Sequence, residues 1–236
     1  MIQSIIEWLL TPASWSGPGG IGARLWEHVL YSGIIMAFAI AIAVPLGLYI
    51  GHTGRARWAV TFANSLRAVP TLGLLFAMTL LVGPLIKSEL AFVIPSIAVL
   101  VLLAIPPILS GAYAGVNSVD PAARDAAHGV GMRSSQVLAR VEVPCAMPLL
   151  MSGIRSATLQ VVATATIAAY VGLGGLGRYL IDGLASGDYV RTAGGAVLVA
   201  VLALAIDGLM ALVERSVVSP GLTGKHVGNT GVVATT

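Results

Sequence analysis

Long stretches without a charged residue are the feature that most limits how this chain can fold. Residues 28–54, 68–86 and 90–119 contain no Lys, Arg, Asp or Glu. Across the whole chain only 10% of residues are charged and the mean hydropathy is +0.92, whereas a soluble domain carries about 25% charged residues. So few charges cannot cover the surface of a soluble protein, and we therefore expect the chain to lie in a lipid bilayer.

The uncharged stretches predict about five transmembrane helices. A helix needs about 20 apolar residues to cross roughly 30 Å of hydrocarbon. Five segments meet this requirement: 29–50; 68–86; 90–119, which is long enough to cross by about residue 111; a segment between Arg155 and Arg178 whose helix starts near Pro148; and 192–213, interrupted only by Asp207. The predicted fold class is all-α integral membrane.

The two ends of the chain differ from this central part. Residues 1–12 are too short to span a bilayer and lack the basic start of a signal peptide, so they are expected to be an interfacial or disordered arm. Residues 216–236 are rich in Gly, Ser, Thr and Val without periodicity, as in a loose tail. The predicted organisation is an external arm over 1–27, a transmembrane domain over 28–215 and a flexible cytoplasmic tail over 216–236.

The basic residues predict the orientation. Grouping the loops around 51–67 and 112–155 with the C-terminus collects nine basic residues on one side: Arg55, Arg57, Arg67, Arg124, Arg133, Arg140, Arg155, Arg215 and Lys225. The other side has four: Arg24, Lys87, Arg178 and Arg191. Because the more basic loops of membrane proteins face the cytoplasm, we expect a multi-pass protein of the cell membrane with its N-terminus outside and its C-terminus inside.

The polar segment 112–147 predicts two short helices near the membrane plane. Asp120 is a good N-cap and Pro121 suits the first helical position. The helix PAARDAAH is expected to end at Gly129 or Gly131, where a positive φ costs little. Ser134 is expected to cap a second helix, SSQVLARVEV, that stops before Pro144. Such an Ala-rich helix can enter a groove on a partner protein. Without further context, however, the composition favours a solvated surface loop.

The spacing of residues in this segment resembles a known family motif. Asp125-Ala126-Ala127 is followed by three residues, Gly131, nine residues and Val141-Glu142-Val143-Pro144. This is similar to the EAA motif of ABC importer permeases (Glu-Ala-Ala, x3, Gly, x9, Ile-x-Leu-Pro), with conservative changes at Asp125, Val141 and Val143. The segments at 67–70, 118–121, 129–132, 153–158 and 172–177 resemble the glycine betaine/carnitine/choline/proline branch of these permeases. The resemblance covers about 28–215.

The resemblance implies a type I ABC importer permease that forms the translocation pathway for an osmoprotectant. It implies four kinds of partner: cytoplasmic ABC ATPase subunits, a second identical or related permease, an extracytoplasmic substrate-binding protein and the lipid bilayer. The chain has no GxxxxGK[ST] phosphate loop, so ATP hydrolysis would belong to a separate polypeptide and this subunit would not be an enzyme. The residues implied in ATPase coupling are Asp120, Pro121, Asp125, Ala126, Ala127, Gly129, Gly131, Val141 and Pro144.

Other classes of function are left as alternatives. A permease for another small solute such as an amino acid would share the same motif. An ATP-independent secondary transporter or pore would need several charges within its spans or internal repeats, and the sequence has neither. A net charge of +3 is too small to indicate nucleic-acid binding.

The remaining candidate residues lie within or next to the spans. Gly172, Gly174, Gly175 and Gly177 form a GxGGxG string that lacks the strand a dinucleotide site needs. Together with Pro70, these glycines are expected to serve helix packing or the pathway. Asp207 is expected to pair with Arg155 at matching depth, with Arg67 as the competing partner and interfacial water as the remaining alternative.

No cofactor or metal is expected. The four histidines and the single Cys145 lack metal-ligand spacing. Recognition of a quaternary ammonium usually needs an aromatic cage, and none is visible in the sequence. Substrate specificity is therefore expected to reside in the binding protein.

Overall fold

The computed structural model describes residues 1–218, and this part of the chain is helical without strands. Four helices are long and apolar enough to cross a membrane, and a bent pair brings the total to as many as five. The all-α membrane fold predicted from the uncharged stretches is therefore confirmed. The four long helices are α3 (Ile21–Thr53), α6 (Val93–Asn117), α9 (Val143–Ala165) and α11 (Tyr189–Val217).

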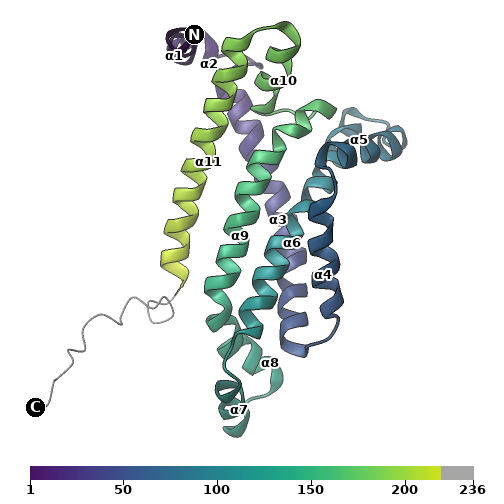
Figure 1. The fold of residues 1–236 in the computed structure, drawn as a ribbon, viewed down its shortest axis with the longest axis vertical. Coiled ribbons are helices and arrows are strands. Elements are labelled where there is room, and N and C mark those ends of the chain that lie inside the picture. The colour runs from purple at the N-terminus through teal and green to yellow at the C-terminus, as the bar shows by residue number, and fades with distance from the viewer. Residues whose placement is uncertain (219–236) are drawn as a thin grey trace, which may run out of the picture.

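Helices α3, α6 and α9 lie side by side and form the core of the bundle (Figure 1). Their backbones touch where small residues meet, as is common between transmembrane helices. A Cβ built on Gly47 of α3 would lie 2.6 Å from the Ala112 Cβ of α6. A Cβ on Gly111 of α6 would lie 2.6 Å from the Leu149 carbonyl oxygen of α9. The glycines therefore set how closely the three helices approach.

The second span differs from the prediction. Instead of one helix over 68–86, the structure has α4 (Arg57–Ser65) with the 3₁₀ turn η1 (Leu66–Ala68), and then α5 (Thr71–Val82) with η2 (Gly83–Leu85). The two halves meet at 96°. Val69 is extended, at φ −75° and ψ 129°, because the following Pro70 disfavours the helical region for the residue before it. Uncharged composition alone could not reveal this break.

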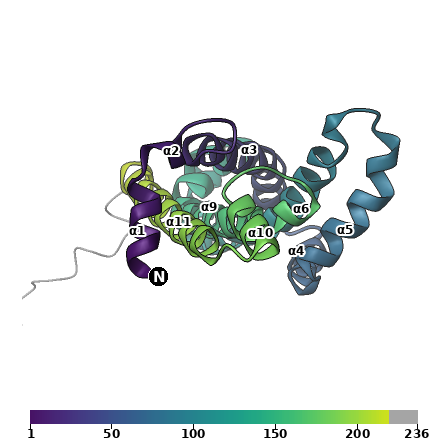
Figure 2. The ribbon, with the colours of Figure 1, turned by 90° about the horizontal axis from the view of Figure 1, so that it is seen from above.

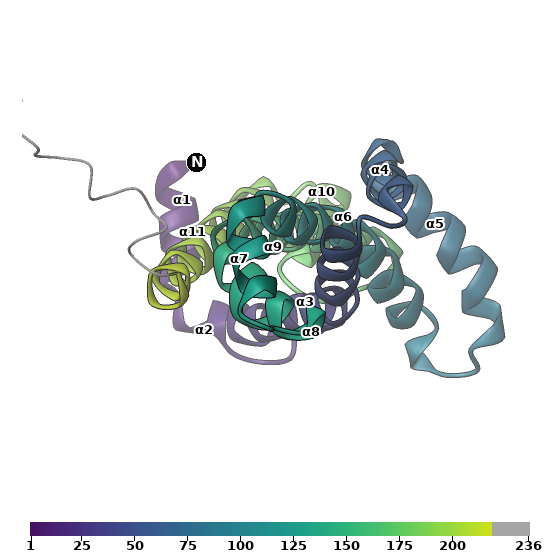
Figure 3. The same cartoon turned by 90° about the horizontal axis from the view of Figure 1, so that it is seen from below.

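The bend also moves Arg67. Helix α4 rises along the bundle from the end of α3, and η1 follows its upper end in Figure 1, away from α7. Arg67 is therefore not beside Arg55 and Arg57, where the prediction placed it. Helices α4 and α11 lie on opposite sides of the bundle (Figure 3), so Arg67 is not the partner of Asp207.

At one end of the bundle, here called the α10 end, the N-terminal arm packs onto the membrane helices. Helices α1 (Ile2–Leu10) and α2 (Pro12–Trp15) lead into α3, and α1 crosses the end of α11 (Figure 2). The Trp8 ring meets Tyr179 of α10 (Gly177–Ser186) edge-on at 5.2 Å. The arm is helical rather than disordered, and α3 begins at Ile21, before the predicted start of the transmembrane domain at residue 28.

At the opposite end, here called the α7 end, α7 (Pro121–Gly129) and α8 (Ser134–Val137) lie below the bundle (Figure 3). The helix after α7 was expected to stop before Pro144. Instead, α8 continues through a π-helical turn, η4 (Leu138–Glu142), into α9. The Val143 N–H bonds to the Leu138 carbonyl, five residues back, and this wider turn accommodates a proline that lacks an N–H. The fourth span thus starts well before Pro148.

Two short 3₁₀ segments complete the described chain: η3 (Glu89–Ala91) before α6 and η5 (Ile167–Val171) after α9. The helix α10 was not predicted. Of the expected tail over 216–236, α11 takes in residues up to Val217, and residues 219–236 lie outside the described part of the chain.

Candidate functional site

Helix α7 is capped at both ends by the residues the sequence indicates. The Ala122 N–H donates to Asp120 Oδ1 at 2.9 Å, and Pro121 occupies the first turn, where its missing N–H costs nothing. At the other end the Met132 N–H donates to the Ala127 carbonyl at 3.1 Å, across Gly131 with φ +86°. The left-handed turn is therefore at Gly131, and Gly129 remains helical.

The two faces of α7 have different environments. Ala127 is buried within the chain, so it is not free to enter a partner's groove. Ala122, Asp125, Ala126 and Gly129 are all exposed. Their spacing of three and four residues places them on one stripe of the helix. The small, exposed stripe of α7 (Ala122, Asp125, Ala126 and Gly129), rather than Ala127, is the surface that could meet another protein.

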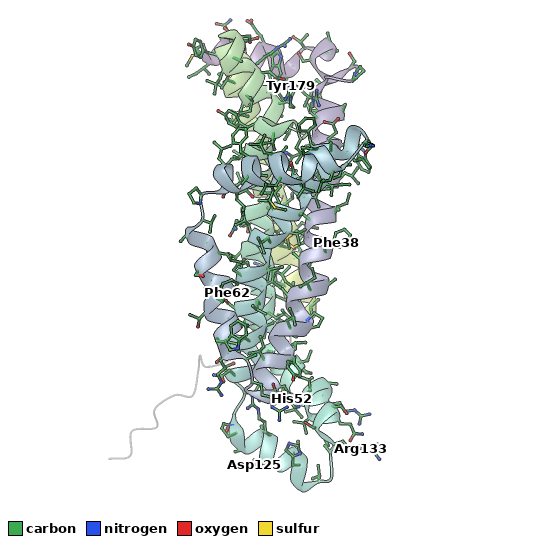
Figure 4. All side chains as sticks on the ribbon, turned by 90° about the vertical axis from the view of Figure 1, so that its right-hand side faces the viewer. Phe38, His52, Phe62, Asp125, Arg133 and Tyr179 are labelled. Atoms are coloured by element: carbon green, nitrogen blue, oxygen red, sulfur yellow. The ribbon has the colours of Figure 1, made fainter. Side chains whose placement is uncertain are left out.

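A buried carboxylate ties α7 to the bundle. Glu142 is 1% exposed, and its Oε1 lies 2.9 Å from Arg124 Nε of α7. Its Oε2 lies 2.6 Å from Nδ1 of His52, at the end of α3 (Figure 4). Arg124 also donates through Nη2 to the Val116 carbonyl of α6, and His52 Nε2 lies 2.7 Å from Ser134 Oγ of α8. We call Glu142, Arg124, His52 and Ser134 the Glu142 cluster.

Sequence reasoning did not find this cluster. Its members come from four separate segments, and the only site for which the sequence suggests testing His52 is a metal site. One signal was available: Glu142 stands among Val141, Val143 and Pro144, and a carboxylate in apolar surroundings needs partners. The π-helical turn directs Glu142 inward, while Val141 is half-buried and Pro144 is exposed. Glu142 thus occupies the unspecified position in the Val141-x-Val143-Pro144 end of the EAA-like motif.

Arg155 of α9 and Asp207 of α11 face each other between the two helices, and each side chain is about one-third exposed. Arg155 donates from Nε to Asp207 Oδ1 at 2.6 Å and from Nη2 to Oδ2 at 2.7 Å. Glu214 adds a weaker contact at 3.5 Å. The planar guanidinium fits a carboxylate through two parallel hydrogen bonds, and each charge is costly in hydrocarbon without the other. This pair joins the middle of α11 to α9.

The glycine string 172–177 forms a tight turn at the α10 end. Gly172 and Gly175 have φ values of +93° and +96°, which only glycine adopts without strain. The Gly175 N–H donates to Glu27 Oε2 at 2.8 Å. Side chains at Gly174 or Gly177 would collide with Glu27 or with the Thr166 carbonyl. These contacts give the string a packing role, and Pro70 lies at the bend before α5.

Residues 39–219 match the family of binding-protein-dependent transport system inner membrane components. This range includes α7, the Glu142 cluster and the Arg155–Asp207 pair. The chain belongs to this family. It is a permease of the binding-protein-dependent class. The family match favours this assignment over an ATP-independent transporter or a pore.

Characterised relatives of the permease match along nearly its whole length. A glycine betaine/carnitine/choline transport system permease protein, OpuCB of Bacillus subtilis, is 34% identical and aligns with 84% of this chain and 88% of its own. The carnitine transport permease protein OpuCD of Listeria monocytogenes is 32% identical, over 91% of this chain and 92% of its own. The osmoprotectant import permease protein OsmW of Salmonella typhimurium is 31% identical, over 81% and 89%. These relatives are transport proteins rather than enzymes.

A solved structure supports the fold independently. The permease superposes on a chain from inward-facing conformations of the MetNI methionine ABC transporter with a TM-score of 0.72. The superposition covers 84% of this chain and 96% of the other at 21% identity. The likeness shows that the permease has the ABC importer permease fold. In the described residues no group of three His, Cys, Asp or Glu side chains is placed to hold a metal.

Proposed function

We propose that this permease forms the pathway of an ATP-driven importer for small quaternary-ammonium osmoprotectants such as glycine betaine, carnitine and choline. The observation that carries the proposal is the near full-length match to three permeases named for these solutes, in three organisms and at 31–34% identity. Methionine, the solute named for the structural neighbour, is less favoured because that likeness rests on 21% identity.

We further infer that α7 couples the permease to a separate cytoplasmic ATPase. The exposed stripe of α7 consists of small side chains, which suits a helix seated in a groove. The Glu142 cluster ties this helix to α3 and α9, so that a push on α7 reaches the membrane bundle. A second permease subunit, identical or related, would complete the pathway, and an extracytoplasmic binding protein would deliver the solute.

The proposed substrate class is tested by uptake. We expect a transport-null host that expresses the permease with its ATPase and binding protein to accumulate radiolabelled glycine betaine, carnitine or choline. Replacing the phosphate-loop lysine of the ATPase should abolish the accumulation, since ATP drives it. Labelled proline and methionine serve as comparison solutes. Uptake of methionine alone, or uptake that persists with the inactive ATPase, would contradict the proposal.

The proposed orientation places the α7 end in the cytoplasm, the N-terminus outside and the C-terminus inside. It is supported by the arginines around α7 and at the end of α3, because basic loops face the cytoplasm. The exposed residues among them include Arg55, Arg57 and Arg133. Figure 4 shows Arg133 at the α7 end and Tyr179 at the opposite end.

The chain's single cysteine tests this orientation. Cys145 is exposed and lies at the α7 end of α9. A membrane-impermeant maleimide should leave Cys145 unlabelled in intact cells and label it in inverted vesicles. Ala185→Cys, at the α10 end and combined with Cys145→Ser, should give the opposite pattern. Labelling after denaturation provides the total for each sample, and a reversed pattern would overturn the orientation.

A further inference from the structure

A pocket walled by aromatic rings opens where the bent second span meets the end of the fourth. Its volume is about 360 Å³, in the range of small-molecule sites. Helix α5 supplies Phe76, Thr79 and Leu80; Phe92 comes from the start of α6; and η5 and its continuation supply Tyr170, Val171 and Gly172, with Arg178 from α10. Helix α5 lies across the bundle at this level (Figure 4).

The pocket combines three chemical features. The rings of Phe76, Phe92 and Tyr170 are each about half exposed and come from three different elements. Thr79 is 92% buried, and within the described residues its hydroxyl has no hydrogen-bond partner. Arg178 lines the same space. It contacts Asp182 through Nε at 3.1 Å and Nη2 at 2.7 Å and donates from Nη1 to the Ala169 carbonyl at 3.3 Å, which leaves one N–H on each Nη for a solute.

We propose that this aromatic pocket is a substrate site within the permease for a small quaternary-ammonium solute that also carries a carboxylate. This inference rests on the proposed function and names the residues that would recognise its substrate. A trimethylammonium group cannot donate hydrogen bonds, but aromatic faces attract it through cation–π interactions. The carboxylate would turn toward Arg178, because two like charges repel and the ammonium must therefore lie away from the guanidinium.

The site would act after the binding protein has released its solute. A weak aromatic surface favours quaternary ammonium over water without holding it tightly, which suits a solute that must leave again. Gly172 has φ +93°, and a Cβ there would contact the Phe92 ring at 3.6 Å. The glycine string thus forms one wall of the pocket as well as a tight turn.

The test is equilibrium binding of labelled glycine betaine to the complete permease–ATPase complex in lipid nanodiscs, without the binding protein. We expect the wild-type complex to bind the solute, and Phe92→Leu and Tyr170→Leu each to weaken binding by about tenfold. Tyr170→Phe keeps the ring and should bind nearly as well as the wild type. The matched control is Phe38→Leu, the same change on an exposed face of α3 outside the pocket (Figure 4).

The role of Arg178 has its own comparison. Arg178→Gln should weaken binding of glycine betaine and carnitine, which carry a carboxylate, more than binding of choline, which does not. Equal losses for all three solutes would overturn the assigned orientation of the substrate.

The outcomes separate this inference from the proposed function. If cells import glycine betaine but the wild-type complex does not bind it, or if Phe92→Leu and Tyr170→Leu bind normally, the aromatic pocket is not a substrate site and the importer function stands. If Phe92→Leu or Tyr170→Leu binds glycine betaine normally but the subunits of the complex dissociate, the rings belong to a subunit or lipid contact. This outcome would also overturn the inference. If cells import no quaternary ammonium at all, the proposed function itself fails.

Discussion

Replacing Ala126 with tryptophan is expected to abolish uptake while leaving the permease folded in the membrane. Ala126 lies on the exposed stripe of α7, and no other element of the described chain buries it. A large ring there would hold α7 away from a partner's groove without disturbing the bundle. We expect Ala126→Trp to reach the membrane at the wild-type level, to fail to co-purify with the ATPase, and to show uptake no higher than a host without the transporter.

Two variants make this result specific. Ala185→Trp is the same change at an exposed position of α10, at the far end of the molecule, and should transport normally. Ala127→Trp should instead lower the folded level, because Ala127 is buried against the chain's own residues and overpacking costs about 1–3 kcal/mol. Full uptake by Ala126→Trp would mean that the exposed stripe of α7 is not the coupling surface.

Replacing Glu142 with alanine is expected to uncouple ATP hydrolysis from transport. The change leaves Arg124 and His52 without the carboxylate that joins α7 to α3. Losing one partner of a buried ion pair costs about 3–5 kcal/mol. The lower figure applies here because Arg124 and His52, which would be left behind, keep some contact with solvent. In proteoliposomes, the number of solute molecules imported per ATP hydrolysed should fall toward zero while hydrolysis continues.

The transport assay needs a control variant, and the contact between Glu142 and Arg124 needs a measurement of stability. Glu7→Ala removes an exposed carboxylate from α1 and should leave the ratio unchanged. In thermal unfolding, the double variant Glu142→Ala with Arg124→Ala should lose less stability than the sum of the two single losses, because both changes break the same contact. If Glu142→Ala transports with the wild-type ratio, the Glu142 cluster is not the path from α7 to the bundle.

Charge gaps predicted the first, third and fifth spans, but they placed the start of the fourth too late, because Arg155 lies inside α9. The stretches 29–50 and 192–213 fall inside α3 and α11, and the uncharged 90–119 contains α6. The same reasoning misassigned the second span, because hydropathy indicates that a segment lies in the membrane but not the direction in which its helix runs. Val69-Pro70 turns the chain by 96° within an uncharged stretch, and α4, with Arg57 and polar residues, has the composition of a loop.

The candidate site was predictable where the information is local. A helix cap and a glycine turn depend on neighbours a few residues away, so Asp120, Pro121 and Gly131 could be assigned from the sequence. The buried side of α7 could not, because Ala126 and Ala127 differ only in what packs against them. The Glu142 cluster and the aromatic pocket join residues distant in sequence, such as His52 with Glu142 and Phe76 with Tyr170, and only tertiary packing brings them together.

The glycine contacts among α3, α6 and α9 have a mechanical consequence. Where backbones touch directly, no side chain lies between the helices to change rotamer and absorb a displacement. We therefore expect the three helices to tilt together as a single lever, about 50 Å long if α3 rises 1.5 Å per residue over its 33 residues. Helix α11, with only Gly194 and Gly195 buried, and the bent limb α4–α5 lie outside this lever. A displacement of α7 would then be carried along the three packed helices, and the compliance of the subunit would be concentrated in α11 and in the limb whose α5 supplies three of the eight residues that line the aromatic pocket.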